Sequence, residues 1–159
     1  AGSILSGNGN TGADPEVLVA ISNLSANMGA ANITEIEFVT TSFDKSDGGN
    51  IDVRVRFNEP VTVTGTPRVS ITNGNQGSGS GRGPHLANYL SGSTTNELLF
   101  RCTIGAANSA TNAGDILVIG TNATALNSGT IKDTGEGTVA TITNTSAQGT
   151  AAGSITVAA

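Results

Sequence analysis

The stretch IDVRVRFNEPVTVTGTP, residues 51–67, indicates the fold class of this chain. Its first half alternates charged residues with four apolar residues, Ile51, Val53, Val55 and Phe57. A period of two places apolar side chains on one face of a β-strand and charged side chains on the other. Pro60 and Pro67 lack an amide donor, so each marks a strand start, a strand edge or a turn. The stretch therefore predicts one clear amphipathic strand, followed by a short strand between the two prolines.

The composition favours β-structure along the whole chain. The 159 residues suit one domain. Their polar content comes mainly from Gly, Ser, Thr and Asn, whereas helices usually draw on Lys, Glu, Leu and Arg. There is no Trp, one Tyr and four Phe, and this scarcity of large aromatic side chains limits the stabilisation of a core. We therefore expect a modest core that relies on a partner surface or on contacts between copies.

Further alternating stretches follow from residue 33 to the C-terminus. They predict short strands near residues 36–38, 61–64, 69–71, 86–90, 98–104, 116–120, 139–143 and 154–158. Polar, glycine-rich stretches separate them and are typical of turns and loops. Seven to eight short strands with this spacing predict an all-β fold, an immunoglobulin-like antiparallel β-sandwich. We expect the sandwich over residues 33–144 and a C-terminal tail or last strand over residues 145–159.

Residues 1–32 differ from the rest and are expected to form an N-terminal arm or a short helix. Asp14, Pro15 and Glu16 are typical of a helix start, with a cap, a proline at the first helical position and an acidic residue. Four apolar residues then recur at helical spacing: Val17, Ile21, Leu24 and Met28. The alternative is a strand, VLVAISN, within an extended arm. In either form we expect this segment to attach the domain to a partner, with these four residues as contacts.

Three separated blocks of the sequence resemble a known family. They are IDVRVRFNEPVTVTGTPRVSITNG, ANYLSGSTTNELLFRCTIGA and ALNSGTIKDTGEG. Together they are similar to a bacterial immunoglobulin-like repeat found in long bacterial and cyanobacterial surface proteins. The resemblance covers roughly residues 44–140 and implies an immunoglobulin-like fold. In that family such modules act as spacers, adhesive units or capping surfaces. The chain departs from the family pattern at Cys102, where a Tyr is usual, and at Gly135-Glu136-Gly137, where the pattern has Gly-Asn.

The construction of the chain is also similar to that of proteins that decorate phage heads. A short chain carries an extra N-terminal segment and ends in a Gly/Ala/Thr-rich tail. This resemblance implies a virion structural protein on the capsid surface, held by residues 1–32 and 145–159. Its partners would be the major capsid protein and neighbouring copies of itself, with a weak outward contact to host surface glycans left open. The alternative is an adhesive or spacer module of a bacterial cell-surface protein.

The charge balance and composition argue against several function classes. Twelve Asp and Glu against seven Lys and Arg give a net charge of −5. Nucleic-acid binding needs clustered basic residues, and none cluster here. No apolar run approaches the roughly 20 residues that cross a bilayer. With no Trp and one Tyr, few aromatic side chains could stack on sugar rings, and we expect a protein that is not an enzyme.

Oxygen-rich loops are the main candidates for metal binding. Loops of this kind can hold Ca²⁺, although the spacing here is not that of an EF-hand and a solvated hairpin loop is the preferred interpretation. The cluster lies in SFDKSDGGNID and comprises Asp44, Asp47, Asn50 and Asp52. Asp133 and Glu136 form a second, weaker candidate on the same grounds. No cofactor is otherwise expected.

Three further features carry chemistry-bearing residue types. His85 follows Gly83-Pro84 at a strand entry and is expected to be a surface or edge histidine, because no partner for a general base lies near it in sequence. Cys102 alternates with apolar neighbours and is expected to be a small buried core residue. Residues 74–83 form a glycine-rich loop without a phosphate-binding motif. Arg82, the only charged residue in this loop, is a candidate partner contact.

Overall fold

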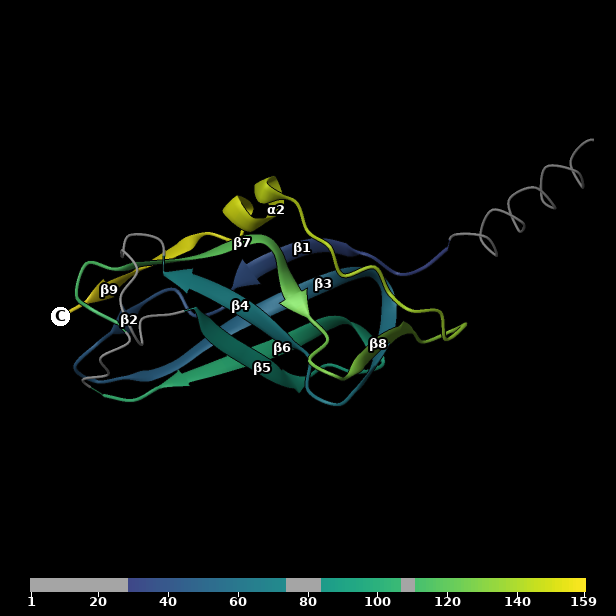
Figure 1. The fold of residues 1–159 in the computed structure, drawn as a ribbon, viewed down its shortest axis with the longest axis horizontal. Coiled ribbons are helices and arrows are strands. Elements are labelled where there is room, and N and C mark those ends of the chain that lie inside the picture. Colours follow the sequence, from purple (N-terminus) through teal and green to yellow (C-terminus); the bar gives the residue numbers. More distant parts are fainter. Residues whose placement is uncertain (1–28, 74–83, 107–110) are drawn as a thin grey trace, which may run out of the picture.

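The structure is a computed structural model that describes residues 29–73, 84–106 and 111–159. Within these residues it contains nine strands and one short helix (Figure 1). The elements are β1 (Ile33–Phe38), β2 (Phe43–Asp44), β3 (Gly49–Thr64), β4 (Arg68–Asn73), β5 (His85–Ser91), β6 (Thr95–Ile104), β7 (Ile116–Ala125), β8 (Thr130–Asp133), α2 (Ser146–Ala151) and β9 (Ser154–Ala158). The all-β prediction is confirmed.

The strands form one curled sheet. Their order is β1-β3-β6-β5-β4-β7-β9-β2, and β8 pairs with the far end of β3. All pairs between named strands are antiparallel except β2 and β9, which run parallel. The sequence predicted a purely antiparallel arrangement, and the parallel pair of β2 and β9 differs from that prediction. The two end strands of the sheet, β1 and β2, are consecutive in the chain, so the sheet curls until its ends approach each other.

Strand β3 lies between β1 and β6, and these three strands carry most of the charged residues of the sheet. Val53 lies opposite Phe38 of β1 on one side and Phe100 of β6 on the other. These side chains are buried, and Tyr89 meets the Phe100 ring edge-to-face with centroids 6.0 Å apart. The sequence predicted a new strand after Pro60, but β3 continues through it. The register of β3 with β6 shifts between Arg56 and Val61, and β3 begins to pair with β8 at Val61. Pro60 lies within this interruption of the ladder, where a backbone amide donor is not required.

The predicted strand at residues 139–143 is wrong. This segment crosses from β8 to the start of β1 and pairs with each at one residue, Val139 with Lys132 and Thr141 with Asn32. A single bridge on each side does not make a ladder. Val139 is accordingly 57% exposed, although the alternation of the segment suggested burial.

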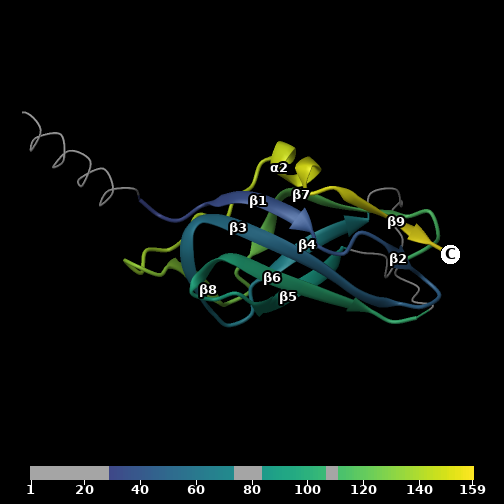
Figure 2. The ribbon, with the colours of Figure 1, turned by 180° about the vertical axis from the view of Figure 1, so that it is seen from behind.

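Helix α2 covers the open edge of the sheet. Thr145 and Gln148 form a capping box at its start, with Thr145 Oγ1 accepting from the Gln148 amide and Gln148 Oε1 accepting from the Thr145 amide. Gln148 Nε2 also donates to the Ile33 carbonyl of β1 at 3.2 Å. The Phe38 amide donates to the Ala152 carbonyl at 3.2 Å. Figure 2 shows α2 beside β1 and β7, where it protects an edge that could otherwise pair with another chain.

The close approach of α2 to β7 depends on Gly149. A Cβ atom at this position would lie 2.4 Å from the Ile119 carbonyl oxygen, so the helix would have to move away from the strand. We predict that Gly149→Ala lowers the free energy of unfolding by about 1–2 kcal/mol. Steric overlap costs about 1–3 kcal/mol, and the better helix propensity of Ala returns up to about 1 kcal/mol. Urea unfolding followed by circular dichroism measures the change.

The matched control is Gly120→Ala in the facing strand. A Cβ at Gly120 meets no atom within 4 Å, so this variant is expected to be as stable as the wild type or slightly more stable. Equal stability of the two variants would contradict the role given to Gly149.

Candidate functional site

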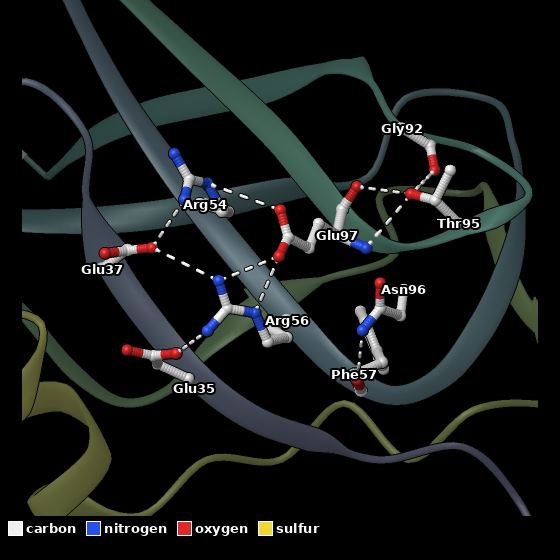
Figure 3. A network of polar contacts seen from close by, with 9 residues as sticks. All are labelled: Glu35, Glu37, Arg54, Arg56, Phe57, Gly92, Thr95, Asn96 and Glu97. Atoms are coloured by element: carbon white, nitrogen blue, oxygen red, sulfur yellow. Dashed lines mark hydrogen bonds and ion pairs between the residues drawn. The ribbon is translucent and has the colours of Figure 1, made fainter.

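The outward side of β1, β3 and β6 carries a network of ion pairs (Figure 3). Arg54 Nη1 donates to Glu37 Oε1 at 2.9 Å, and Arg56 Nε donates to Glu97 Oε2 at 2.9 Å. Arg56 also pairs with Glu35 of β1. The hydrogen bond from Arg56 to Glu97 is the main cause that raises the pKa of this guanidinium. The side chains remain 34–46% exposed, so solvent and salt screen these pairs.

Asp52, one of the four calcium candidates, belongs to this charged face. Arg101 Nε and Nη2 donate to its two carboxylate oxygens at 2.8 and 2.9 Å. This is a bidentate pair, which fixes both partners and occupies both oxygens. The structure therefore separates Asp52 from the other three candidates.

Asp44, Asp47 and Asn50 line a hollow of about 520 Å³ beside β2. Asp44 Oδ1 accepts from the amide and the hydroxyl of Ser46, at 2.8 and 2.6 Å, and these hydrogen bonds lower the pKa of Asp44. Asn50 Oδ1 accepts from Thr103 Oγ1 at 2.7 Å. Among residues 29–73, 84–106 and 111–159, no group of three His, Cys, Asp or Glu is placed to hold a metal ion. Calcium binding here stays a prediction from the sequence.

The structure brings Asp133 close to Glu59, a residue that sequence reasoning missed. Asp133 pairs in register with Val61, so Glu59, two residues earlier on β3, lies on the same side of the sheet. Asp133 is buried, and its Oδ1 accepts from the Glu136 amide at 2.7 Å. Glu136, the other calcium candidate in this loop, therefore contacts Asp133 through its backbone amide. Glu59 precedes a proline, and only the tertiary pairing of β3 with β8 shows that it meets a second carboxyl group.

The Glu59 and Asp133 carboxyl groups influence each other's pKa. Glu59 Oε2 is buried and has no hydrogen-bond donor when both groups are ionised. A hydrogen bond to Asp133 raises the pKa of Glu59, and burial and the Asp133 charge act in the same direction. The pKa of Asp133 is lowered, first by the Glu136 amide and then by Glu59. As the pH falls, Glu59 therefore takes up a proton before Asp133 does.

We predict that Glu59→Gln stabilises the protein at neutral pH. The folded state raises the pKa of Glu59 above its ordinary value of 4.5, so this group contributes stability below pH 4.5 that is lost as the pH rises through the folded pKa. Glutamine carries no charge, and its amide can donate to Asp133. Chemical unfolding over a pH series should show a gain for Glu59→Gln at neutral pH that disappears toward pH 4.5. The exposed Glu136→Gln is the matched control, and an equal gain there would contradict the pairing.

A second buried polar group lies where β4, β5 and β7 meet. His85 is only 8% exposed, so the expectation of a surface histidine is wrong. Its side chain faces inward because it pairs in register with the buried Ile71 of β4. Asn73 Nδ2 donates to Asp115 Oδ2 at 2.8 Å, and Lys45 Nζ donates to the Thr111 carbonyl at 2.9 Å. His85 Nε2 is buried without a hydrogen-bond partner.

His85 makes stability depend on pH. Burial lowers its pKa below the ordinary value of 6.5, and the Asp115 charge only partly opposes this. The unfolded chain therefore binds the proton more readily, so stability falls as the pH drops from 6.5 to the folded pKa. We predict that His85→Leu removes this loss and is at least as stable as the wild type at about pH 7.5. Urea unfolding of both chains at about pH 7.5 and pH 5.5 measures it. An unchanged pH dependence in His85→Leu would contradict the assignment.

The remaining candidates are a cysteine and the partner contacts. Cys102 lies in the core opposite Ile51, as predicted, and burial raises the pKa of its thiol. A raised thiol pKa disfavours the reactive thiolate. The partner-contact candidates lie outside the described residues: Val17, Ile21, Leu24, Met28 and Arg82.

No family model, curated protein or solved structure matches this chain. In the part of the chain that the structure describes, no helix is long and apolar enough to cross a membrane.

Proposed function

We propose that the protein is a non-enzymatic structural protein of a virion, an immunoglobulin-like module that decorates the outer shell of a phage capsid. The observation that carries the proposal is where the chain enters and leaves the β body. In Figure 1 the segment that leads into β1 lies at one end of the long axis and the C-terminus lies at the other. A body held by its N-terminal residues would stand away from the shell and present its far end outward.

The body is suited to stand alone on such a surface. Helix α2 covers the edge of β1, and β2 at the other end of the sheet is only two residues long. Short and covered edges prevent strand-to-strand aggregation of crowded copies. The ion pairs on β1, β3 and β6 are largely satisfied within the chain, so this face can remain in solvent. Many weak contacts on a lattice add up to firm attachment.

The same entry and exit geometry also suits the alternative function. A module with its two ends far apart can be strung into a tandem array, as the resemblance to bacterial surface repeats implies. This alternative, an adhesive or spacer module, predicts sibling repeats in the same polypeptide. Intact-mass spectrometry of purified particles distinguishes the two, because a decoration protein co-purifies with the major capsid protein as a separate chain.

We predict that capsid attachment depends on residues 1–28 rather than on the β body. Capsids that lack the protein are mixed with the full-length chain or with residues 29–159, and binding is measured by co-sedimentation. Only the full-length chain is expected to bind, while both show the same thermal unfolding. The full-length double variant Leu24→Ser and Met28→Ser should bind at least about tenfold more weakly. Val139→Ser, an exposed apolar residue on the body, is the matched control. Full binding by residues 29–159 would overturn this attachment.

A further inference from the structure

Three polar side chains lie together at one end of the sheet. Asn73 ends β4, His85 begins β5 and Asp115 immediately precedes β7. His85 and Asp115 are both buried. Within the described residues, His85 Nε2 and Asn73 Oδ1 are buried without a hydrogen-bond partner. A buried polar atom without a partner destabilises the closed form, and access to water removes that cost.

Asp115 connects this end of the sheet to the last strand. Its Oδ2 accepts from Asn73 Nδ2 at 2.8 Å and from the Asn112 amide at 2.9 Å. Its backbone carbonyl accepts from the Val157 amide of β9 at 2.8 Å, and the Gly114 amide donates to the Val157 carbonyl at 2.8 Å. The turn at Asp115 therefore holds the end of β4 through a side chain and the end of β9 through the backbone.

Strand β9 can separate from the body without disturbing the centre of the sheet. Its ladder with β7 covers only Ile116 to Val118, and β2, its other neighbour, has two residues. The ladder of β3 with β6 is much longer and runs from Gly49 to Arg56 before its register shifts. Segments with short ladders open at a lower free energy than the rest of a fold.

The groups around His85 give a bound proton little support. Among the described residues, β7 contributes the Asp115 carboxylate, which already accepts two hydrogen bonds. β4 contributes the uncharged Asn73, β6 the buried thiol of Cys102, and β9 no ionisable residue. Lys45, which follows β2, is a cation and donates to the turn before β7. Burial consequently outweighs the attraction of Asp115, and the pKa of His85 is lowered.

We propose that this end of the sheet is an acid-sensitive latch. When His85 takes up a proton, the turn at Asp115 releases Val157, and β9 separates from β7. Strands β1, β3 and β6 keep their pairing. Opening admits water to His85 Nε2 and to Asn73 Oδ1, so the open form accommodates the proton that the closed form resists. Acid therefore acts first on the end of the sheet that carries β9.

The test is hydrogen exchange of the isolated full-length chain, followed by mass spectrometry at about pH 7.5 and pH 5.5 and corrected for the intrinsic exchange rates. Between the ordinary pKa of 6.5 and the lowered pKa of folded His85, each pH unit shifts opening about tenfold. Residues 154–158 are therefore expected to lose up to about tenfold in protection at the lower pH, while residues 51–57 keep theirs.

Two variants remove the titrating group. His85→Leu and His85→Gln should each show the same protection of residues 154–158 at both pH values. Glutamine keeps a polar side chain at this position, so it serves where leucine disturbs the fold, and circular dichroism shows whether each variant is folded. Ile155→Val is the matched control, because it removes a buried methyl group from β9 without changing an ionisable group. It should raise exchange of β9 equally at both pH values.

Three outcomes would overturn the latch. Protection of residues 154–158 could be the same at both pH values in the wild type. Residues 51–57 could lose protection to the same extent, which would show that the whole fold opens. The loss in residues 154–158 could persist in the folded His85 variants, which would assign it to another group. The isolated chain is measured, so the result does not depend on the proposed virion function.

Discussion

The structure depends on the pairing of β3 with β1 on one side and with β6 on the other. Alternate residues of β3 are buried, and Val53 and Val55 each have an apolar partner in both flanking strands. The intervening residues include Arg54 and Arg56, which reach carboxylates on the same two strands. A shift of one residue in either register would bury the arginines and expose the core, so the alternation fixes both at once. The ion pairs are consistent with this register, but burial of the apolar face supplies its energy.

The described interior contains several buried polar residues, and at two places these include carboxyl or histidine side chains. At the far end of β3, Glu59 meets Asp133. At the start of β5, His85 lies near Asp115. The two have opposite effects, because the first favours a bound proton in the folded state and the second disfavours one. As the pH falls, protonation of Glu59 adds stability and the lowered pKa of His85 removes it, so the two dependences have opposite signs.

The two halves of the sheet differ in the residues that they expose. Charged side chains on β1, β3 and β6 satisfy one another and keep that side hydrated. Strands β4, β5, β7 and β9 carry hydroxyl groups and aliphatic side chains, and Arg68 of β4 is the single Asp, Glu, Lys or Arg within these described strands. Helix α2 links the two sides because Gly149 allows it to approach the β7 backbone closely, and its Gln148 donates to β1.

The sequence by itself determined the all-β class, the amphipathic strand at residues 51–57 and the burial of Cys102, because each depends on a local period of two. It could not determine that β3 continues through Pro60, because that depends on its pairing with β8, which follows β1 along the same side of β3. The burial of His85 depends on its register with Ile71, and the raised pKa of Glu59 depends on Asp133, which is distant in the chain. The segment at 139–143 alternates as a strand does, yet the fold leaves it only single bridges. Local pattern fixes which side of a strand is apolar, but long-range pairing decides what each side meets, and the tertiary structure alone supplies that pairing.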